Sequence, residues 1–291
     1  MGRISRLLGL AAFVTLAGLA DSTATAGPQS FPMKLERGSR LTIAARINGR
    51  PVSALLDSAA EATIIDKGLA KQLHLDHGES VAGQGSGNAS FDAQLVNGVT
   101  LEALGLRLEN QTVAVADLSD VGRRLLHHPV DAILGREIFD AARLSIDIEG
   151  GRISVVGRDQ APRGARLDLV TEHGIETVAV RVESGEPVRA TFDLGNGSHV
   201  LVSAALAKRL RFLSDGRKVV TERGGGLGGE ADRQVFKLRE LEIAGRKFAD
   251  LEAAVDPNPS ASDVNIGVSV LRHFQITTDY SQHAVWLEPR S

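Results

Sequence analysis

Two aspartates stand at matching places in two similar stretches of this chain. Asp57 ends the apolar run in "VSALLDSAA", and Asp193 ends the run in "VRATFDLGN". A carboxylate at the end of a strand, followed by a turn, can point into a cleft. Two carboxylates about 3 Å apart share one proton, and their apparent pKa values separate. Such a pair can activate a water molecule with one carboxylate and protonate an amide nitrogen with the other. That chemistry is peptide hydrolysis without a covalent intermediate.

An internal repeat surrounds both aspartates. Residues 41–73 and 176–210 each read as a strand, a polar turn, a second strand, the aspartate, a third strand and a short helical stretch. Residues 130–155 and 262–287 repeat as well, because each has an aspartate four residues before a glycine and another twelve residues after it. Each half is therefore one copy of one structural unit. The polar, turn-rich segment 156–166 is the expected connector.

Each half also contains a glycine cluster, at residues 83–90 and 224–232. Neither cluster has the strand–glycines–helix order that cradles a pyrophosphate. A hairpin or loop over a groove is the preferred interpretation, and a plain flexible turn is the alternative.

These motifs resemble those of bacterial retropepsin-like aspartic peptidases, of the pepsin and retropepsin superfamily, with two tandem units in one chain. The family pattern is two apolar residues, Asp, Thr or Ser, and Gly, followed later in each unit by two apolar residues and Gly before a short helix. This sequence has "LLDSAA" with "AILGRE" in its first half and "TFDLGN" with "VNIGVS" in its second. The resemblance covers about residues 36–288 and implies that Asp57 and Asp193 are the catalytic pair.

The resemblance also implies supporting roles for the turn after each aspartate and for the apolar–apolar–Gly element beside it. The turn hydroxyls brace the two loops against each other, the turn glycine lets the carboxylates approach, and a glycine-rich hairpin closes over the substrate. The supporting residues expected here are Ser58, Ala59, Gly195, Leu134, Gly135 and Gly267.

Two positions depart from the family pattern. Ala59 stands where glycine is usual, and its methyl group adds bulk near the meeting point of the loops. Leu194 stands where a hydroxyl is usual, so only Ser58 can contribute a brace.

The expected fold is mainly β, with two similar acid-protease-like lobes about a pseudo-twofold axis. Each lobe should have one or two short helices, and the lobes should span residues 28–158 and 164–291. The groove between them should bind a peptide or protein substrate in an extended conformation, because a strand-like peptide can pair with loop backbone. One chain carries both aspartates, so a monomer is expected, and pairing of two chains to complete one site is the alternative.

The amino terminus reads as a signal peptide covering residues 1–26. Arg3 and Arg6 precede an apolar stretch, and Ala24-Thr25-Ala26 fits a small-x-small cleavage site. The apolar stretch is shorter than the roughly 17–25 residues of a transmembrane helix. We expect a periplasmic or secreted protein with no membrane attachment after cleavage.

Composition excludes several other classes. The chain has no cysteine, so disulfides and thiolate metal sites are absent. A net charge of −3 without a basic block argues against nucleic acid as a partner. His74 and His77 have metal-ligand spacing but no evident third ligand, so a solvated helix end is preferred. No metal or organic cofactor is expected.

Two functions from different classes follow. The first is an exported aspartic endopeptidase that uses an Asp-activated water. The alternative, favoured by Ala59 and Leu194, is a catalytically impaired peptide-binding protein on the same scaffold. For Asp57 alone, a buried turn aspartate that accepts backbone N–H bonds is a third interpretation.

Overall fold

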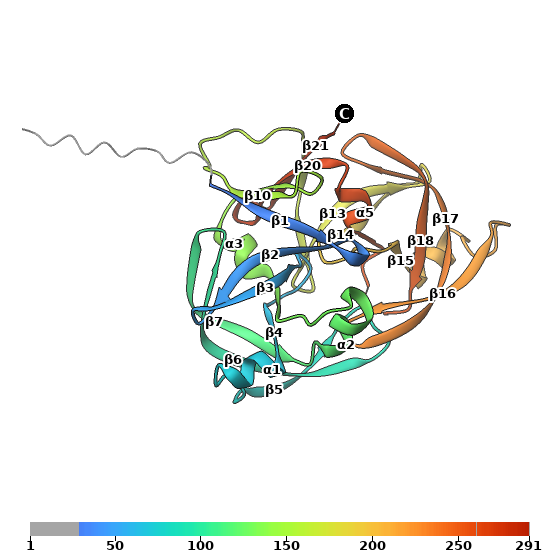
Figure 1. Ribbon diagram of the computed structural model, residues 1–291. Helices are drawn as coiled ribbons and strands as arrows, with labels where there is room; N and C mark the ends of the chain where they lie inside the picture. The colour runs from blue at the N-terminus through green and yellow to red at the C-terminus, as the bar shows by residue number, and fades with distance from the viewer. Residues whose placement is uncertain (1–28, 260, 291) are drawn as a thin grey trace, which may run out of the picture.

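The computed structural model describes residues 29–259 and 261–290, and it is mainly β with two similar lobes (Figure 1). In Figure 1 the first lobe, blue to green, lies on the left, and most of the second lobe, yellow to red, lies on the right. The predicted signal peptide, residues 1–26, lies outside the described residues.

The first lobe runs from β1 to β10. Its strands are β1 (Ser30–Glu36), β2 (Arg40–Ile47), β3 (Arg50–Leu56), β4 (Ile64–Asp66), β5 (Glu79–Gln84), β6 (Ser90–Ala103), β7 (Leu106–Ala116), β8 (Ala132–Leu134), β9 (Leu144–Asp147) and β10 (Arg152–Val155). Its helical segments are η1 (Arg37–Ser39), α1 (Lys67–Gln72), α2 (Ser119–Val121), η2 (Gly122–Leu126) and α3 (Arg136–Ala141).

The second lobe runs from β11 to β21. Its strands are β11 (Ala165–Asp168), β12 (Val170–Glu172), β13 (Ile175–Val182), β14 (Pro187–Phe192), β15 (Val200–Ser203), β16 (Val219–Gly226), β17 (Gly229–Ile243), β18 (Arg246–Asp256), β19 (Val264–Ile266), β20 (Phe274–Asp279) and β21 (Ala284–Pro289). Its helical segments are α4 (Ala204–Arg209), α5 (Val268–Leu271) and η3 (Tyr280–Gln282).

The two lobes repeat one strand order. In the first lobe β3 pairs in parallel with β8, with Leu56 opposite Leu134. In the second lobe β14 pairs in parallel with β19, with Phe192 opposite Ile266. The third strand of each copy, β4 or β15, then pairs with the other side of β8 or β19. The residue after β3 and the residue after β14 therefore emerge at equivalent places.

Local sequence explains the turns and helix starts of the repeat. Asn48 and Gly49 join β2 to β3 with φ angles of 47° and 79°, as an Asn-Gly hairpin turn requires. In the second copy the positive φ angles fall on Glu183 and Ser184, one residue earlier than the predicted Ser184-Gly185 turn. Helix α1 begins where the Asp66 side chain accepts a hydrogen bond from the Gly68 amide.

A shared sheet joins the lobes. Strand β9 pairs antiparallel with β20, with Leu144 opposite Thr278, in the order β11-β21-β20-β9-β10-β1. Arg143 and Asp279, both buried, form an ion pair of 3.0 Å across this junction. These strands lie along the top of the view in Figure 1 and hold the lobes in one orientation.

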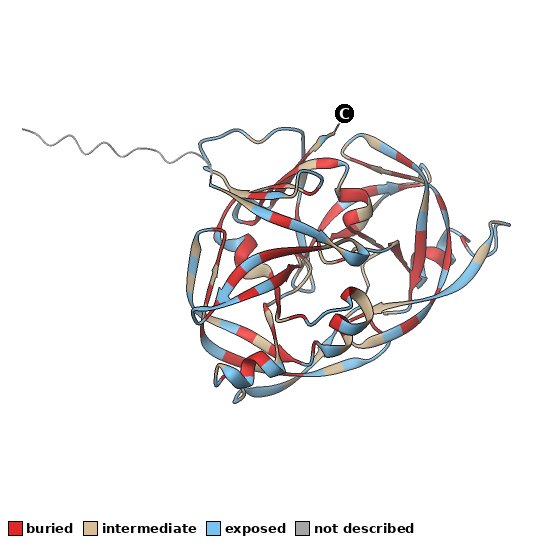
Figure 2. Cartoon of the chain, in the orientation of Figure 1, coloured by how far each residue is buried: buried red, intermediate tan, exposed pale blue. Residues whose placement is uncertain are grey.

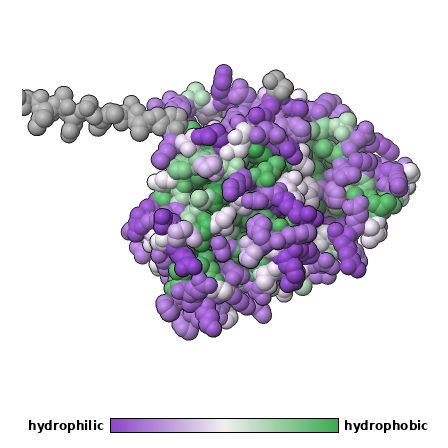
Figure 3. All heavy atoms as spheres, in the orientation of Figure 1, coloured by the Kyte–Doolittle hydropathy of each residue, from purple (hydrophilic) through white to green (hydrophobic). Residues whose placement is uncertain are grey.

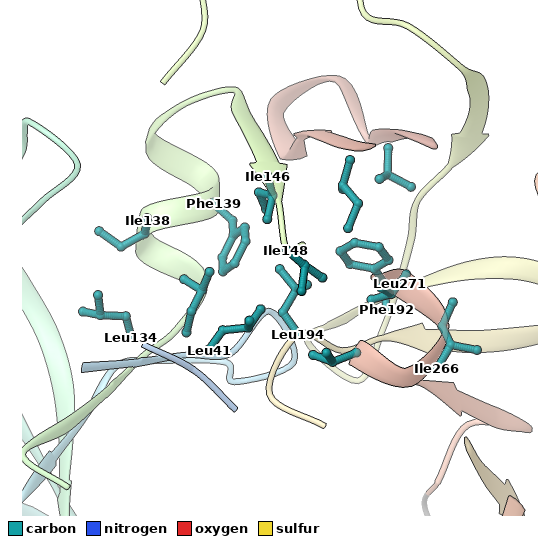
Figure 4. Packing of buried hydrophobic residues seen from close by; sticks show 14 of the residues in the cluster. Leu41, Leu134, Ile138, Phe139, Ile146, Ile148, Phe192, Leu194, Ile266 and Leu271 are labelled. Carbon is teal, nitrogen blue, oxygen red and sulfur yellow. The ribbon is translucent and has the colours of Figure 1, made fainter. Parts of the chain in front are cut away.

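The largest hydrophobic cluster contains residues of both lobes, and buried stretches appear in both lobes in Figure 2. Figure 4 shows Leu41 and Ile148 from the first lobe in the same cluster as Phe192, Leu194 and Leu271 from the second. Leu194 is fully buried. Leu194 stands where a residue with a hydroxyl group is usual, and its side chain instead forms part of the hydrophobic core between the lobes.

Hydrophilic side chains cover most of the face in Figure 3, with hydrophobic residues showing mainly in its recessed parts. Within residues 29–259 and 261–290, every helix is too short or too polar to cross a bilayer.

Candidate active site

Each aspartate is fixed by the strand that parallels its own. The Asp57 amide, just after β3, donates a hydrogen bond of 3.0 Å to the Leu134 carbonyl at the end of β8. The Asp193 amide donates an equivalent bond of 3.0 Å to the Ile266 carbonyl. The apolar–apolar–Gly elements therefore lie beside their own aspartate loops.

The two aspartate loops are tied together by one hydroxyl. The buried Ser58 Oγ donates to the Phe192 carbonyl at 2.8 Å and accepts from the Leu194 amide at 2.9 Å. Because Leu194 has no hydroxyl, the reciprocal bond from the second loop is missing. The brace is one-sided, in the direction that the sequence predicts.

Gly195 allows the loops to approach closely. A Cβ atom at position 195 would lie 2.3 Å from the Asp57 carboxyl carbon, so any side chain there would displace the carboxylate. On the opposite loop the Ala59 methyl is accommodated, and Ala59 lines the cleft while its amide donates to Asp57 Oδ1 at 2.9 Å. The two turn positions are therefore not interchangeable, because position 59 holds a methyl group whereas a methyl group at position 195 would overlap the Asp57 carboxylate.

The remaining supporting glycines fill crowded positions below the loops. A Cβ at Gly135 would lie within 2.9 Å of the Ala60 and Ala62 backbone oxygens. A Cβ at Gly267 would lie 2.1 Å from the Asn196 carbonyl oxygen. Each glycine therefore permits the short helix, α3 or α5, to start directly against its aspartate turn.

The two carboxylates have different partners. Asp193 Oδ1 accepts from the Gly195 amide at 2.8 Å and the Asn196 amide at 2.9 Å, and Asp193 Oδ2 accepts from Asn265 Nδ2 at 2.7 Å. The Asn265 amide is itself oriented, since its Oδ1 accepts from Asn196 Nδ2 at 2.8 Å. The matching residue in the first lobe is Ile133, which offers Asp57 no such donor.

This asymmetry separates the two acids. Burial, with the negative charge of Asp193 added, raises the pKa of Asp57 to about 7. Burial also raises the pKa of Asp193, but the Asn265 amide opposes that shift by stabilising the carboxylate, whereas the Arg40 guanidinium lowers the pKa of both acids. Because the Asn265 amide donates to the Asp193 carboxylate and has no counterpart at Asp57, the geometry places the shared proton on Asp57.

Arg40, at the start of β2, is a cation in the same cleft that the sequence motifs did not indicate. Arg40 lines the cleft together with Asp57 and Asp193, and both negative charges act on its guanidinium. Arg40 Nη1 is shielded from solvent and has no hydrogen-bond partner within the described chain.

The cleft has a volume of about 690 Å³ and is lined by both lobes and by both glycine-rich hairpins. The hairpins β5–β6 and β16–β17 touch at their tips, where the Gly87 amide donates to the Leu227 carbonyl at 2.8 Å and the Ala89 amide donates to the Gly228 carbonyl at 3.2 Å. Both glycine clusters are therefore hairpin tips over one groove.

A helical segment that the sequence motifs did not indicate, α2 with η2, supports the second hairpin. Arg124 of η2 donates to the Gly226 carbonyl at 2.9 Å and is held by Asp120 at 2.9 Å. The first lobe thus holds the hairpin of the second lobe near its tip.

Two structural lobes of one design, an aspartate loop from each, and a groove covered by two hairpins define an acid-protease-like protein. A sequence model of the aspartyl protease family matches residues 43–138 and 178–270, one match in each lobe. The chain belongs to this family of retropepsin-like aspartyl proteases and carries two tandem units. A search of the curated proteins finds no match.

The sequence motifs led to the aspartates and their loops but not to Asn265 or Arg40. A signal for Asn265 was present, since it is a polar residue in "VNIG" where the first copy has an apolar one in "AILG". Arg40 carried no such signal, because the contact of its strand with the second aspartate turn exists only in the folded chain. Within the described residues no group of three or more His, Asp or Glu side chains is placed to hold a metal ion, and His74 and His77 belong to no such group.

Proposed function

We propose that this protein is an aspartic endopeptidase in which Asp57 and Asp193 are the catalytic pair. The observation that carries the proposal is the Ser58 bridge between the two loops, which holds both aspartates at one place in the cleft. The raised pKa of Asp57 supports a pair that carries one proton over acidic to neutral pH.

The unequal partners of the two acids assign their roles. Asp193, with three hydrogen bonds to its carboxylate, is the base that accepts a proton from the attacking water. Asp57 carries the shared proton and gives it to the carbonyl oxygen as the water oxygen bonds to the carbonyl carbon. The resulting gem-diol then collapses. The amide nitrogen takes the proton from Asp193, the C–N bond breaks, and a gem-diol hydroxyl returns a proton to Asp57.

The substrate in this proposal is an extended peptide or protein segment beneath the two hairpins. A strand-like peptide can pair with hairpin backbone while alternate side chains enter pockets of the cleft. Because the hairpin tips contact each other, they must separate to admit a chain. Both aspartates come from one chain, so a monomer suffices.

A peptide library assay tests the activity. Purified protein lacking residues 1–26 is incubated with the library from pH 3 to 8, and products are identified by mass spectrometry. We expect cleavage at internal bonds that is lost in Asp57→Asn and in Asp193→Asn. Asp168→Asn, the same change at an exposed site on β11, is the matched control and should cleave normally. Cleavage that survives both active-site substitutions would sink the mechanism.

A second candidate function is peptide binding without hydrolysis. The Ala59 methyl in the cleft and the one-sided brace favour it. Saturable binding of library peptides by a wild-type protein that leaves them intact would support this alternative.

We further propose that the protein is exported, since residues 1–26 have the pattern of a signal peptide. Cell fractionation and amino-terminal sequencing test this. A periplasmic or secreted chain that starts at Gly27 is expected, and a cytoplasmic chain that starts at Met1 would contradict it.

A further inference from the structure

Arg40 is a cation of the cleft that feels the negative charges of Asp57 and Asp193 but is not in contact with either. Within the described chain its guanidinium forms neither an ion pair nor a hydrogen bond, and its Nη1 is shielded from water. A buried guanidinium without a partner is unfavourable, because its hydration is lost without compensation. The two aspartates, which together carry about one negative charge when they share a proton, act on the guanidinium through space, but within the described chain no hydrogen bond or ion pair joins them to it.

The position of Arg40 is set by both lobes. It follows η1, and η1 lies against η2 of its own lobe and against the turn after Asp193 of the other. A Cβ atom at Gly197 would lie 2.6 Å from Arg40 Nη1, so this glycine makes the room that the guanidinium occupies. The Arg40 guanidinium thus lies against the turn that follows Asp193.

Two further arginines increase the positive charge on this side of the cleft. Arg124 and Arg233 are both near enough to disfavour the charged form of Arg40, and burial disfavours it most. Arg124 is neutralised by Asp120. Arg233 feels the negative charge of Asp256, while its buried Nε lacks a hydrogen-bond partner within the described chain. The unpartnered Arg40 Nη1 and Arg233 Nε favour a ligand that accepts hydrogen bonds here, and a guanidinium bonds most strongly to an anionic acceptor.

We propose that Arg40 binds a carboxylate of the peptide substrate, and that the protein therefore selects peptides with an acidic group at a fixed position close to the scissile bond. A guanidinium can hold a carboxylate with two parallel hydrogen bonds, which gives both strength and geometric selectivity. The carboxylate can come from an Asp or Glu side chain or from the carboxyl terminus of the peptide. This inference rests on the proposed endopeptidase function.

Matched peptides test the selectivity. A quenched fluorescent peptide that the wild type cleaves is made with Glu or Gln at each of three positions on either side of the cleaved bond, with both termini blocked. A second arm compares a free with an amidated carboxyl terminus. We expect kcat/KM to be about 10-fold or more higher for the carboxylate member of one pair, as hydrogen bonds to a charged group allow. The arm that shows the preference identifies the source of the carboxylate.

Variants at Arg40 assign the preference to its side chain. Arg40→Gln should bring the Glu-to-Gln ratio of kcat/KM close to one, and Arg40→Lys should retain part of it, since charge remains but the fork is lost. Arg46→Gln, an exposed change on the same strand, is the control and should keep the full ratio. Because each ratio is measured at one pH, a shift in the pKa of the aspartates cancels.

Binding to the Asp57→Asn protein separates this inference from the proposed function. Fluorescence anisotropy of the labelled peptide pairs reports the preference even if the wild type hydrolyses nothing. Equal affinity and equal kcat/KM for all pairs, or a preference that persists in Arg40→Gln with an unchanged melting curve, would overturn the inference. If Arg40→Gln does not fold, a reduced Glu-to-Gln ratio in folded Arg40→Lys supports the inference and an unchanged ratio overturns it.

Discussion

Replacing Asn265 with leucine tests the division of roles between the two aspartates. The substitution removes the 2.7 Å hydrogen bond from Asn265 Nδ2 to Asp193 Oδ2. It leaves Asn196 Nδ2 with its second acceptor, the His199 carbonyl at 3.1 Å, so the turn keeps part of its support. A hydrogen bond to a charged group contributes about 1.5–3 kcal/mol. At 1.36 kcal/mol per unit, that energy corresponds to roughly 1–2 pKa units.

The direction of the effect follows from the protonation state that the mechanism needs. Asn265 stabilises the ionised form of Asp193, so its loss raises the pKa of Asp193. Because the proposed base must be ionised, the acidic limb of the kcat/KM profile should move up by roughly 1–2 pH units. The alkaline limb, set by loss of the proton from Asp57 at a pKa of about 7, should move less. The pH window of activity therefore narrows from its acidic side.

The assay is a pH profile of kcat/KM from pH 3 to 8 with one quenched peptide, for wild type and for Asn265→Leu. Asn97→Leu removes an exposed amide on β6 and is the matched control. Melting curves confirm that both variants are folded. An acidic limb of Asn265→Leu that coincides with that of the wild type would refute the assignment of Asp193 as the base.

Three further outcomes are expected. Ser58→Ala loses both bonds between the loops, so the free energy of unfolding in urea should fall by about 1–3 kcal/mol, and no change would contradict the brace. Gly195→Ala places a methyl group 2.3 Å from the Asp57 carboxyl carbon and should abolish cleavage, whereas Ala59→Gly should retain it. Similar kcat values for the two variants would argue against the difference between turn positions 59 and 195. Asp57→Asn should raise the free energy of unfolding at pH 7. Burial raises the pKa of Asp57 from 3.8 to about 7, so the folded wild type binds a proton more tightly and loses stability as pH rises through that interval. Calorimetry should find that gain absent below pH 3.8, and a gain that persists at pH 3 would contradict this reasoning.

Local patterns were sufficient for much of the architecture. The Asn48-Gly49 turn, the short helix after each third strand and the hairpin tips at both glycine clusters all depend on neighbours within a few residues. Because each motif occurs in both copies of the repeat, the sequence identified Asp57 and Asp193 as equivalent residues before any contact between them was known. The shifted turn at Glu183 shows the limit of that approach, since non-glycine residues there adopt positive φ.

The sequence by itself determined the repeated strand order and the two aspartate turns, because both follow from the periodicity of the chain and from motifs a few residues long. Only the tertiary structure decided which side chains share the cleft with the pair. Ser58 meets Phe192 across 134 residues, Asn265 reaches Asp193 across 72, and Arg40 comes to the aspartates from another strand. Such contacts arise when segments far apart in the chain pack together within and between the lobes, and neither periodicity nor spacing carries that information.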